Sequence, residues 1–202
     1  MLGLPKSTEL NKPLPKTAIY TKFQMNAAEK AKIDADISRI VIVNEVSAAK
    51  LNLEPGESVQ AFFVLQVTLK HREFSEKTLI TLSKLIPQHM VLLLECDGQA
   101  KLAVYHTKLL QTPWRDPTDL TLAIKGLTMD AVWENVIVQV GNIRLQTGNT
   151  LDQQIAIDEQ RAKLEKEIAR LEKLAWAEKQ PKKKFELVQR INMLKKESRG
   201  VE

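Results

Sequence analysis

The residues with the clearest potential for chemistry are two of the three histidines, His89 and His106, and the single cysteine, Cys96. Two imidazoles side by side on a sheet could share a metal ion or couple their titrations. A metal site needs at least one more ligand, and His71 is the only further histidine. Cys96 has an acidic residue on each side, which raises a thiol pKa. We therefore expect structural roles for these residues, with no metal and no cofactor.

Acidic residues near the ends of expected strands raise the alternative of a divergent metal-dependent nuclease or hydrolase. Restriction-type nucleases hold their metal with an Asp and a Glu-x-Lys on adjacent strands. The candidates here are Glu57, Glu95 and Asp97, and none has a lysine two positions further along. Phosphate-loop, dinucleotide, nucleophile-elbow and HExxH motifs are also absent. The sequence favours a protein without catalytic residues, and the nuclease or hydrolase stays as the alternative.

The net charge of +5 is divided unevenly along the 202 residues. Residues 1–32 carry six lysines and two glutamates, and residues 179–199 carry eight basic and two acidic side chains, whereas the body between them is mildly acidic. Binding responds to local potential rather than to the sum. We therefore expect any contact with a polyanion to come from the ends of the chain. The predicted nucleic-acid-binding residues are Lys182, Lys183, Lys184, Arg190, Lys195, Lys196 and Arg199.

Composition also bounds the location of the protein. No stretch of about 18 apolar residues could span a bilayer, and the first residues lack the apolar core of a signal peptide. A single cysteine fits a reducing compartment. We expect a cytoplasmic protein that contacts no membrane.

Two buried strands with a helix between them form the expected centre of the fold. The alternating residues from Val59 to Leu69 predict a strand that is covered on both sides, and residues 89–95 predict a second. Between them, Ser75 is a helix N-cap and Pro87 ends the helix. This β-α-β order implies two parallel strands.

A tight hairpin should follow the second of these strands. Asp97-Gly98 is a strong two-residue turn signal, because both positions need positive φ. Pairing across this turn sets Val91 against Val104, and His89 opposite His106. A further strand is expected at Leu120, Leu122 and Ile124, and a helix at residues 129–140, capped by Thr128.

The segments before the β-α-β unit predict an arm and a helix. Prolines among polar residues indicate an extended basic arm over residues 1–25. A capping-box spacing at Asn26 and a 3–4 residue apolar repeat predict a helix over about 27–43, although the β-branched run Ile40–Val43 favours a strand and leaves its end open.

The last fifty residues are rich in Glu, Lys, Ala and Arg, and their apolar residues follow a nearly heptad repeat. Pro181 interrupts this pattern, which predicts two helices that either fold back on each other or pack on a partner. The predicted docking residues for a protein partner are Leu164, Ile168, Leu171, Phe185, Val188, Ile191 and Leu194.

Together these segments predict an α+β fold. A small mixed sheet with a β-α-β-β core is flanked by helices over residues 26–145, and residues 150–199 form a coiled-coil-like helical extension.

Short motifs spread over nearly the whole chain resemble the bacterial domain-of-unknown-function family numbered 4391. They are the segments 4–9, 14–16, 48–53, 86–87, 126–135 and 181–185. Val41-Ile42-Val43-Asn44 departs from the family pattern, which has a tryptophan before the asparagine. The resemblance carries no activity. It implies an association with helicases and DNA methyltransferases of restriction-like or phage-defence loci.

We therefore expect a non-catalytic accessory or adaptor subunit of a DNA-processing complex. Its C-terminal helices would dock a protein partner such as a helicase or a DNA methyltransferase, and its basic tail would make nonspecific nucleic-acid contacts. Besides the divergent nuclease or hydrolase, an inhibitor-like partner of one specific protein is a third hypothesis.

Overall fold

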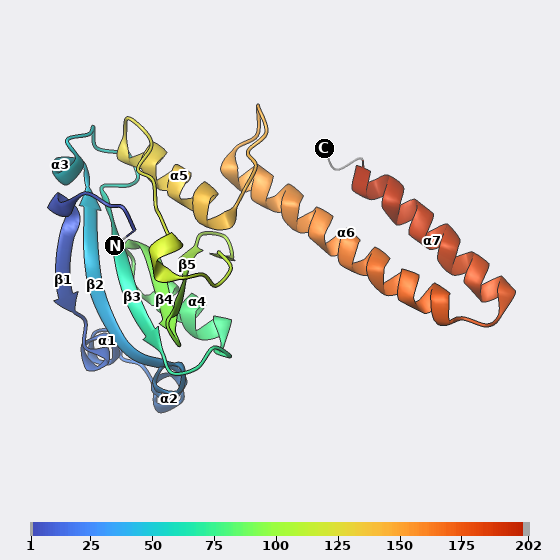
Figure 1. Ribbon diagram of the computed structural model, residues 1–202, viewed down its shortest axis with the longest axis horizontal. Coiled ribbons are helices and arrows are strands. Elements are labelled where there is room, and N and C mark those ends of the chain that lie inside the picture. The colour runs from blue at the N-terminus through green and yellow to red at the C-terminus, as the bar shows by residue number, and fades with distance from the viewer. Residues whose placement is uncertain (1, 200–202) are drawn as a thin grey trace. The chain divides into compact units, whose positions relative to one another are not determined.

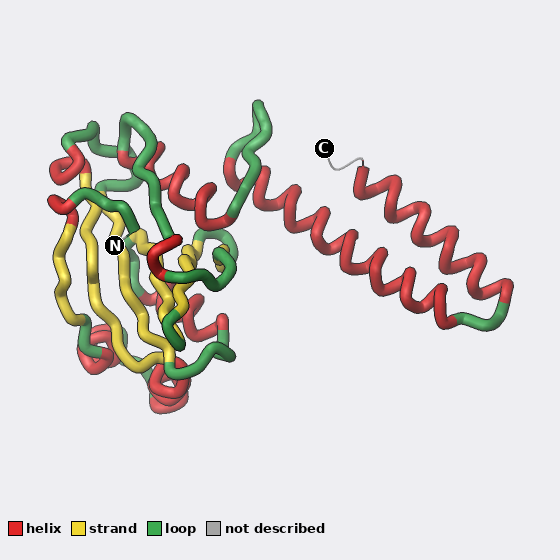
Figure 2. The backbone as a smooth tube through the Cα atoms, viewed as in Figure 1, coloured by secondary structure: helices red, strands yellow, loops and turns green. Residues whose placement is uncertain are grey.

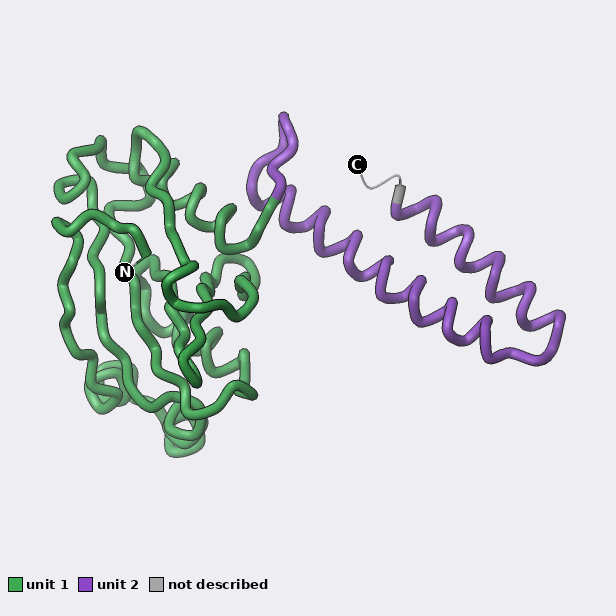
Figure 3. The backbone as a smooth tube through the Cα atoms, viewed as in Figure 1, with its two compact units in different colours: residues 1–143 green, residues 144–202 purple. Residues whose placement is uncertain are grey.

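The computed structural model describes residues 2–199, which form two compact units (Figure 3). The first unit lies within residues 1–143, and the second lies within residues 144–202. The boundary falls near the expected end of the core, but the first unit also includes the amino-terminal residues.

The described part of the first unit is built on one six-stranded sheet (Figures 1 and 2). Its strands are β1 (Glu9–Pro13), β2 (Ile37–Ser47), β3 (Ala61–Leu69), β4 (His89–Cys96), β5 (Gln99–Tyr105) and β6 (Leu109–Gln111). They lie in sequence order, and neighbours are antiparallel except for β3 and β4. Helix α4 (Glu76–Leu85) joins this parallel pair. The expected α+β class and its β-α-β-β core are confirmed.

The hairpin between β4 and β5 has the predicted register. Asp97 and Gly98 both have positive φ, and Val91 pairs with Val104. The ladder between β4 and β5 ends at this pair and β5 stops at Tyr105, so the predicted pairing of His89 with His106 does not form.

Apolar side chains cover both faces of the central strands. On one face, Leu65 and Leu92 belong to a core with residues of α1 (Lys16–Lys22), α2 (Ala27–Asp36) and α4. On the other face, the Phe62 ring lies 5.2 Å from Trp133 of α5 (Met129–Gly141). Helix α5 begins at the predicted cap, where the Ala131 N–H donates to the Thr128 hydroxyl over 3.3 Å. The sheet therefore lies between α1, α2 and α4 on one face and α5 on the other.

The expected helix over residues 27–43 is wrong in its second half. Helix α2 has the predicted capping box at Asn26 but ends at Asp36, and residues 37–47 form β2. The β-branched run from Ile40 to Val43 packs well on a pleated surface and poorly in a helix. Pairing with β1 on one side and β3 on the other settles the conformation.

The expected extended arm over residues 1–25 is also wrong, because these residues are part of the first unit. A short 3-10 helix (Lys6–Thr8) precedes β1, and α1 follows it. The Lys16 ammonium donates to the Asp34 carboxylate and, over 2.9 Å, to the Ile37 carbonyl, so α1 is tied to α2 and β2.

The expected strand at residues 120–124 does not form either. Pro117–Asp119 is a 3-10 helix, and the last strand of the sheet is β6. Leu120 and Leu122 are nevertheless buried, and the Leu122 N–H donates to the Leu2 carbonyl over 3.0 Å.

A carboxylate ties the start of α5 to the loop before β3. Asp130 accepts from the backbone N–H groups of Val59 at 2.7 Å, Glu57 at 2.6 Å and Ser58 at 3.2 Å. A Cβ on Gly56 would lie 2.6 Å from an Asp130 oxygen, so only glycine fits there. These bonds, with that from Val59 first, hold the pKa of Asp130 below its usual range.

The second unit is a hairpin of α6 (Leu151–Ala177) and α7 (Pro181–Arg199). The predicted interruption at Pro181 is confirmed, since it starts α7, where proline is well tolerated. The interface between the helices buries the side chains of Leu171, Ala175, Ile191 and Leu194. Of the two arrangements that the sequence left open, the helices fold back on each other.

We expect Asp130→Asn to reduce the acid sensitivity of the protein. A carboxylate whose folded pKa is depressed stabilises the fold above its ordinary pKa, and this stabilisation is lost as pH falls. Thermal unfolding of wild type and variant from about pH 7 to about pH 3 measures the difference. The wild type should lose its advantage on acidification. Parallel pH profiles would contradict the role of this charge.

The hairpin interface predicts opposite outcomes for two apolar substitutions. Leu171→Ala should destabilise the hairpin by about 2–4 kcal/mol, because it opens a cavity between α6 and α7. Phe185→Ala should change stability by at most about 0.5 kcal/mol, because its ring is exposed. Hydrogen exchange of the α6 and α7 amides in the full chain distinguishes them. Equal protection in both variants would refute this packing.

Candidate nucleic-acid interface

His89 packs against an aromatic ring, and Cys96 is buried. The His89 ring packs 5.0 Å from Trp133, and partial burial, followed by the nearby His106, lowers the pKa of His89 against the opposing effect of Asp130. Cys96 is buried, and burial and then Asp97 raise the pKa of its thiol. Among the described residues, no group of three or more His, Cys, Asp or Glu side chains could hold a metal ion.

The three acidic residues of the nuclease alternative have separate surroundings. The Glu57 backbone is held by Asp130, the Glu95 carboxylate accepts from the Gln66 amide over 2.7 Å, and the Asp97 carboxylate lies 3.9 Å from Arg72. These contacts give each residue a local structural partner.

Five of the seven predicted docking residues lie in the interface between α6 and α7. Leu171, Ile191 and Leu194 are buried there, and Leu164 and Ile168 are half-buried against them. Leu187, which the sequence analysis did not select, packs with these residues.

The other two predicted docking residues, Phe185 and Val188, are exposed. The apolar repeat of α7 therefore faces α6 through Leu187, Ile191 and Leu194, because residues three or four positions apart share a helix face. Phe185 and Val188 remain open to other contacts.

One of the predicted nucleic-acid-binding residues pairs with an acidic side chain of α6, and the charge of a second acts on another. The Lys195 ammonium lies 2.7 Å from the Glu172 carboxylate. Glu167, whose pKa is lowered first by its hydrogen bond to Arg170, also feels the charge of Arg190. The Arg199 side chain lies outside what the structure describes. Lys182, Lys183, Lys184 and Lys196 are exposed.

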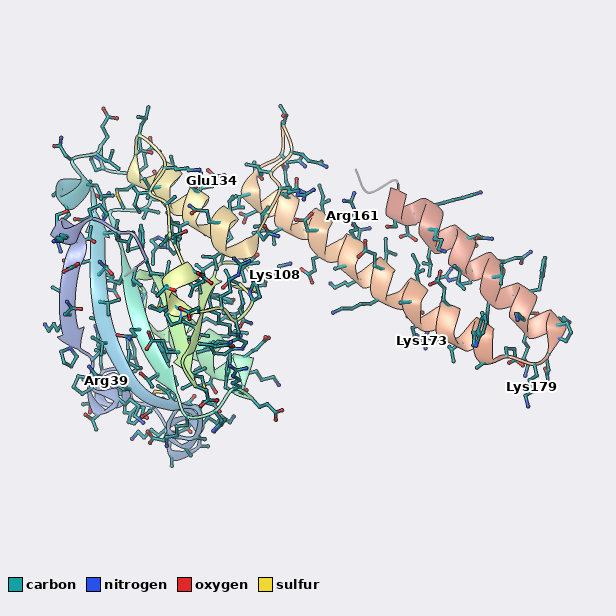
Figure 4. The ribbon with its side chains drawn as sticks, in the orientation of Figure 1. Arg39, Lys108, Glu134, Arg161, Lys173 and Lys179 are labelled. Atoms are coloured by element: carbon teal, nitrogen blue, oxygen red, sulfur yellow. The ribbon has the colours of Figure 1, made fainter. Side chains whose placement is uncertain are left out.

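Lysines gather where α6 turns into α7. We define the lysine corner as Lys173, Lys179, Lys182, Lys183 and Lys184, and Figure 4 labels Lys173 on α6 and Lys179 in the turn. Residues 173–185 contain one acidic residue, Glu178. In the described structure, no ion pair holds any of the five ammonium groups, so they are available to an anion.

The corner also exposes an aromatic residue that the sequence analysis missed. The Trp176 side chain is 88% exposed. The apolar repeat of α6 could have predicted this exposure, because Trp176 directly follows Ala175, which faces α7. A residue directly after an inward position lies about 100° further round the helix, at the margin of the interface rather than inside it.

The lysines at the start of α7 interact unfavourably with the helix dipole. The first turn of α7 has no acidic residue and three lysines, whereas the positive end of the dipole favours negative groups. Helix stability does not explain this placement, which suits an external anion.

Every described helix is too short or too polar to cross a membrane.

The comparisons with known proteins give one match. A family model described as "Domain of unknown function (DUF4391)" matches residues 2–197. No curated protein and no solved structure matches the chain.

The dipole argument predicts opposite stability effects at the two ends of α7. Lys182→Glu should stabilise the helix by about 0.3–1 kcal/mol, and Lys196→Glu, with the same change of charge in the last turn, should destabilise it by a similar amount. Hydrogen exchange of the α7 amides at low salt compares the two variants, and the effects should shrink at about 1 M salt. Shifts of equal sign would rule out the dipole as the cause.

Proposed function

Because the chain belongs to the family described as Domain of unknown function (DUF4391), whose description assigns no activity, we propose a function from its own surface. The protein is a non-catalytic accessory subunit of a DNA-processing complex, and its helical hairpin makes nonspecific contacts with nucleic-acid phosphates.

The lysine corner carries this proposal. Its five exposed ammonium groups share one end of the hairpin with a single acidic residue, Glu178. Each lysine that neutralises a phosphate releases counterions, which gives affinity without sequence preference. We therefore propose the lysine corner, rather than the whole basic tail, as the surface that contacts phosphates. Lys195 is paired with Glu172 of α6, and the charge of Arg190 acts on Glu167.

The identity of the partner is proposed from the family resemblance. A helicase or a DNA methyltransferase of a restriction-like or phage-defence complex in the cytoplasm would supply the enzymatic activity. The residues that pack inside the hairpin, such as Leu171 and Leu194, are occupied within the chain. Docking would therefore use other surfaces than the apolar repeat.

Nothing specific favours the nuclease or hydrolase alternative in the described residues. Glu95 is bound to an amide, Asp97 lies near Arg72, and the Glu57 backbone is part of the Asp130 contact. A divalent metal needs several oxygen ligands at one point, which this arrangement does not provide.

We expect a triple variant, Lys182→Gln with Lys183→Gln and Lys184→Gln, to lose DNA affinity and salt dependence. The slope of log K against log salt should become shallower by about 0.9 for each lysine that contacts a duplex phosphate. Fluorescence anisotropy of a labelled duplex over a salt series measures this slope for the full chain.

The matched control removes three exposed lysines of the first unit, Lys32, Lys77 and Lys125. It has the same net charge as the corner variant and should bind DNA like the wild type. If both variants lose affinity equally, overall charge and not the corner attracts DNA. If the wild type does not bind at low salt, the proposed function is wrong.

A further inference from the structure

Two exposed aromatic rings stand at the same end of the hairpin as the lysine corner. Trp176 belongs to the last turn of α6 and is 88% exposed, and Phe185 belongs to the second turn of α7 and is 62% exposed. Only residues 178–180 separate the two helices. Neither ring belongs to the apolar interface that holds α6 and α7 together.

An ion pair places Trp176 and Val188 on one edge of the hairpin. Glu172 and Trp176 are four residues apart on α6 and share a face. Val188 and Lys195 are seven residues apart, two turns, and share a face of α7. Because Lys195 lies 2.7 Å from Glu172, these two faces meet.

Lys184 and Phe185 lie one turn before Val188, four and three positions earlier, so they extend the same edge towards the corner. We define the aromatic edge as Trp176, Lys184, Phe185 and Val188. It combines two large flat rings with an ammonium group and adjoins the other lysines of the corner.

This combination matches a nucleic-acid strand with unpaired bases. Such strands bind to positive surfaces through phosphates and to aromatic rings through stacking, at a gain of about 5- to 150-fold in affinity per base. A duplex offers its phosphates but keeps its bases stacked inside, so it would use the lysines alone. An acidic protein surface would also be attracted by the lysines, but it has no general need for two open rings.

We propose that the aromatic edge binds single-stranded nucleic acid, with Trp176 and Phe185 stacking on bases while the lysine corner holds the phosphates. This inference rests on the proposed function and adds the substrate class: unpaired strands are preferred over duplex. Val188 supplies apolar contact beside the rings.

The test compares a labelled oligothymidylate of about 12 nucleotides with a duplex of equal length, by anisotropy on the full chain. Trp176→Ala should weaken single-strand binding about 5- to 150-fold and leave duplex binding unchanged. Trp176→Phe should retain much of the affinity, because it keeps an aromatic face. Met193→Ala is the matched control, since Met193 is 61% exposed on α7 but lies five positions from Val188, on a different face.

Tryptophan fluorescence gives a second readout. Trp133 is buried and Trp114 is half-buried, so quenching by unlabelled oligothymidylate should come from Trp176 and disappear in Trp176→Phe. Circular dichroism of each variant verifies that the helices are retained.

The outcomes separate the two proposals. If wild type and Trp176→Ala bind both nucleic acids equally and no quenching occurs, the stacking inference is overturned and the phosphate contacts stand. If neither nucleic acid binds at low salt, both proposals are wrong.

Discussion

Burial of β3 and β4 on both faces is the constraint on which the first unit depends. Parallel neighbours need a crossover, and α4 supplies it while covering one face with Leu79 and Leu82. The opposite face then requires its own cover, which α5 gives through Trp133. Helix α5 is in turn fixed by the Asp130 carboxylate, so one polar contact between segments far apart in the sequence holds the layer on this face.

The sequence predicts those parts of the fold that depend on residues close together in the chain. The Asp97-Gly98 turn and the Thr128 cap act within a few residues, and both are confirmed. The apolar spacing of β2 fits both the helical and the strand period, and only pairing with its neighbours β1 and β3 decides between them. Strand β1 has exposed side chains throughout, so it owes its conformation to backbone pairing, which leaves no apolar pattern to read.

The candidate site was predictable in its charge but not in its geometry. Lys182 to Lys184 are visible as a run in the sequence. Which residues of α7 face α6 depends on the packing of two helices, and turning α7 by about half a turn would exchange Leu187 for Phe185 at the interface. Trp176 and Phe185 lie at the same end of the hairpin only because the chain reverses at the corner. The exposed rings therefore became evident only from the folded hairpin.

Strand β1 also covers the edge of the sheet at which another chain could pair with β2. The strand beside it, β2, is long and rich in Val and Ile. Without β1, its unpaired backbone groups could pair with a strand of another chain. The cover is short, polar and closed by Pro13, which has no N–H to offer to another strand. Displacing residues 9–13 would leave β2 as an edge strand, so a segment that contributes almost nothing to the core covers the backbone of a core strand.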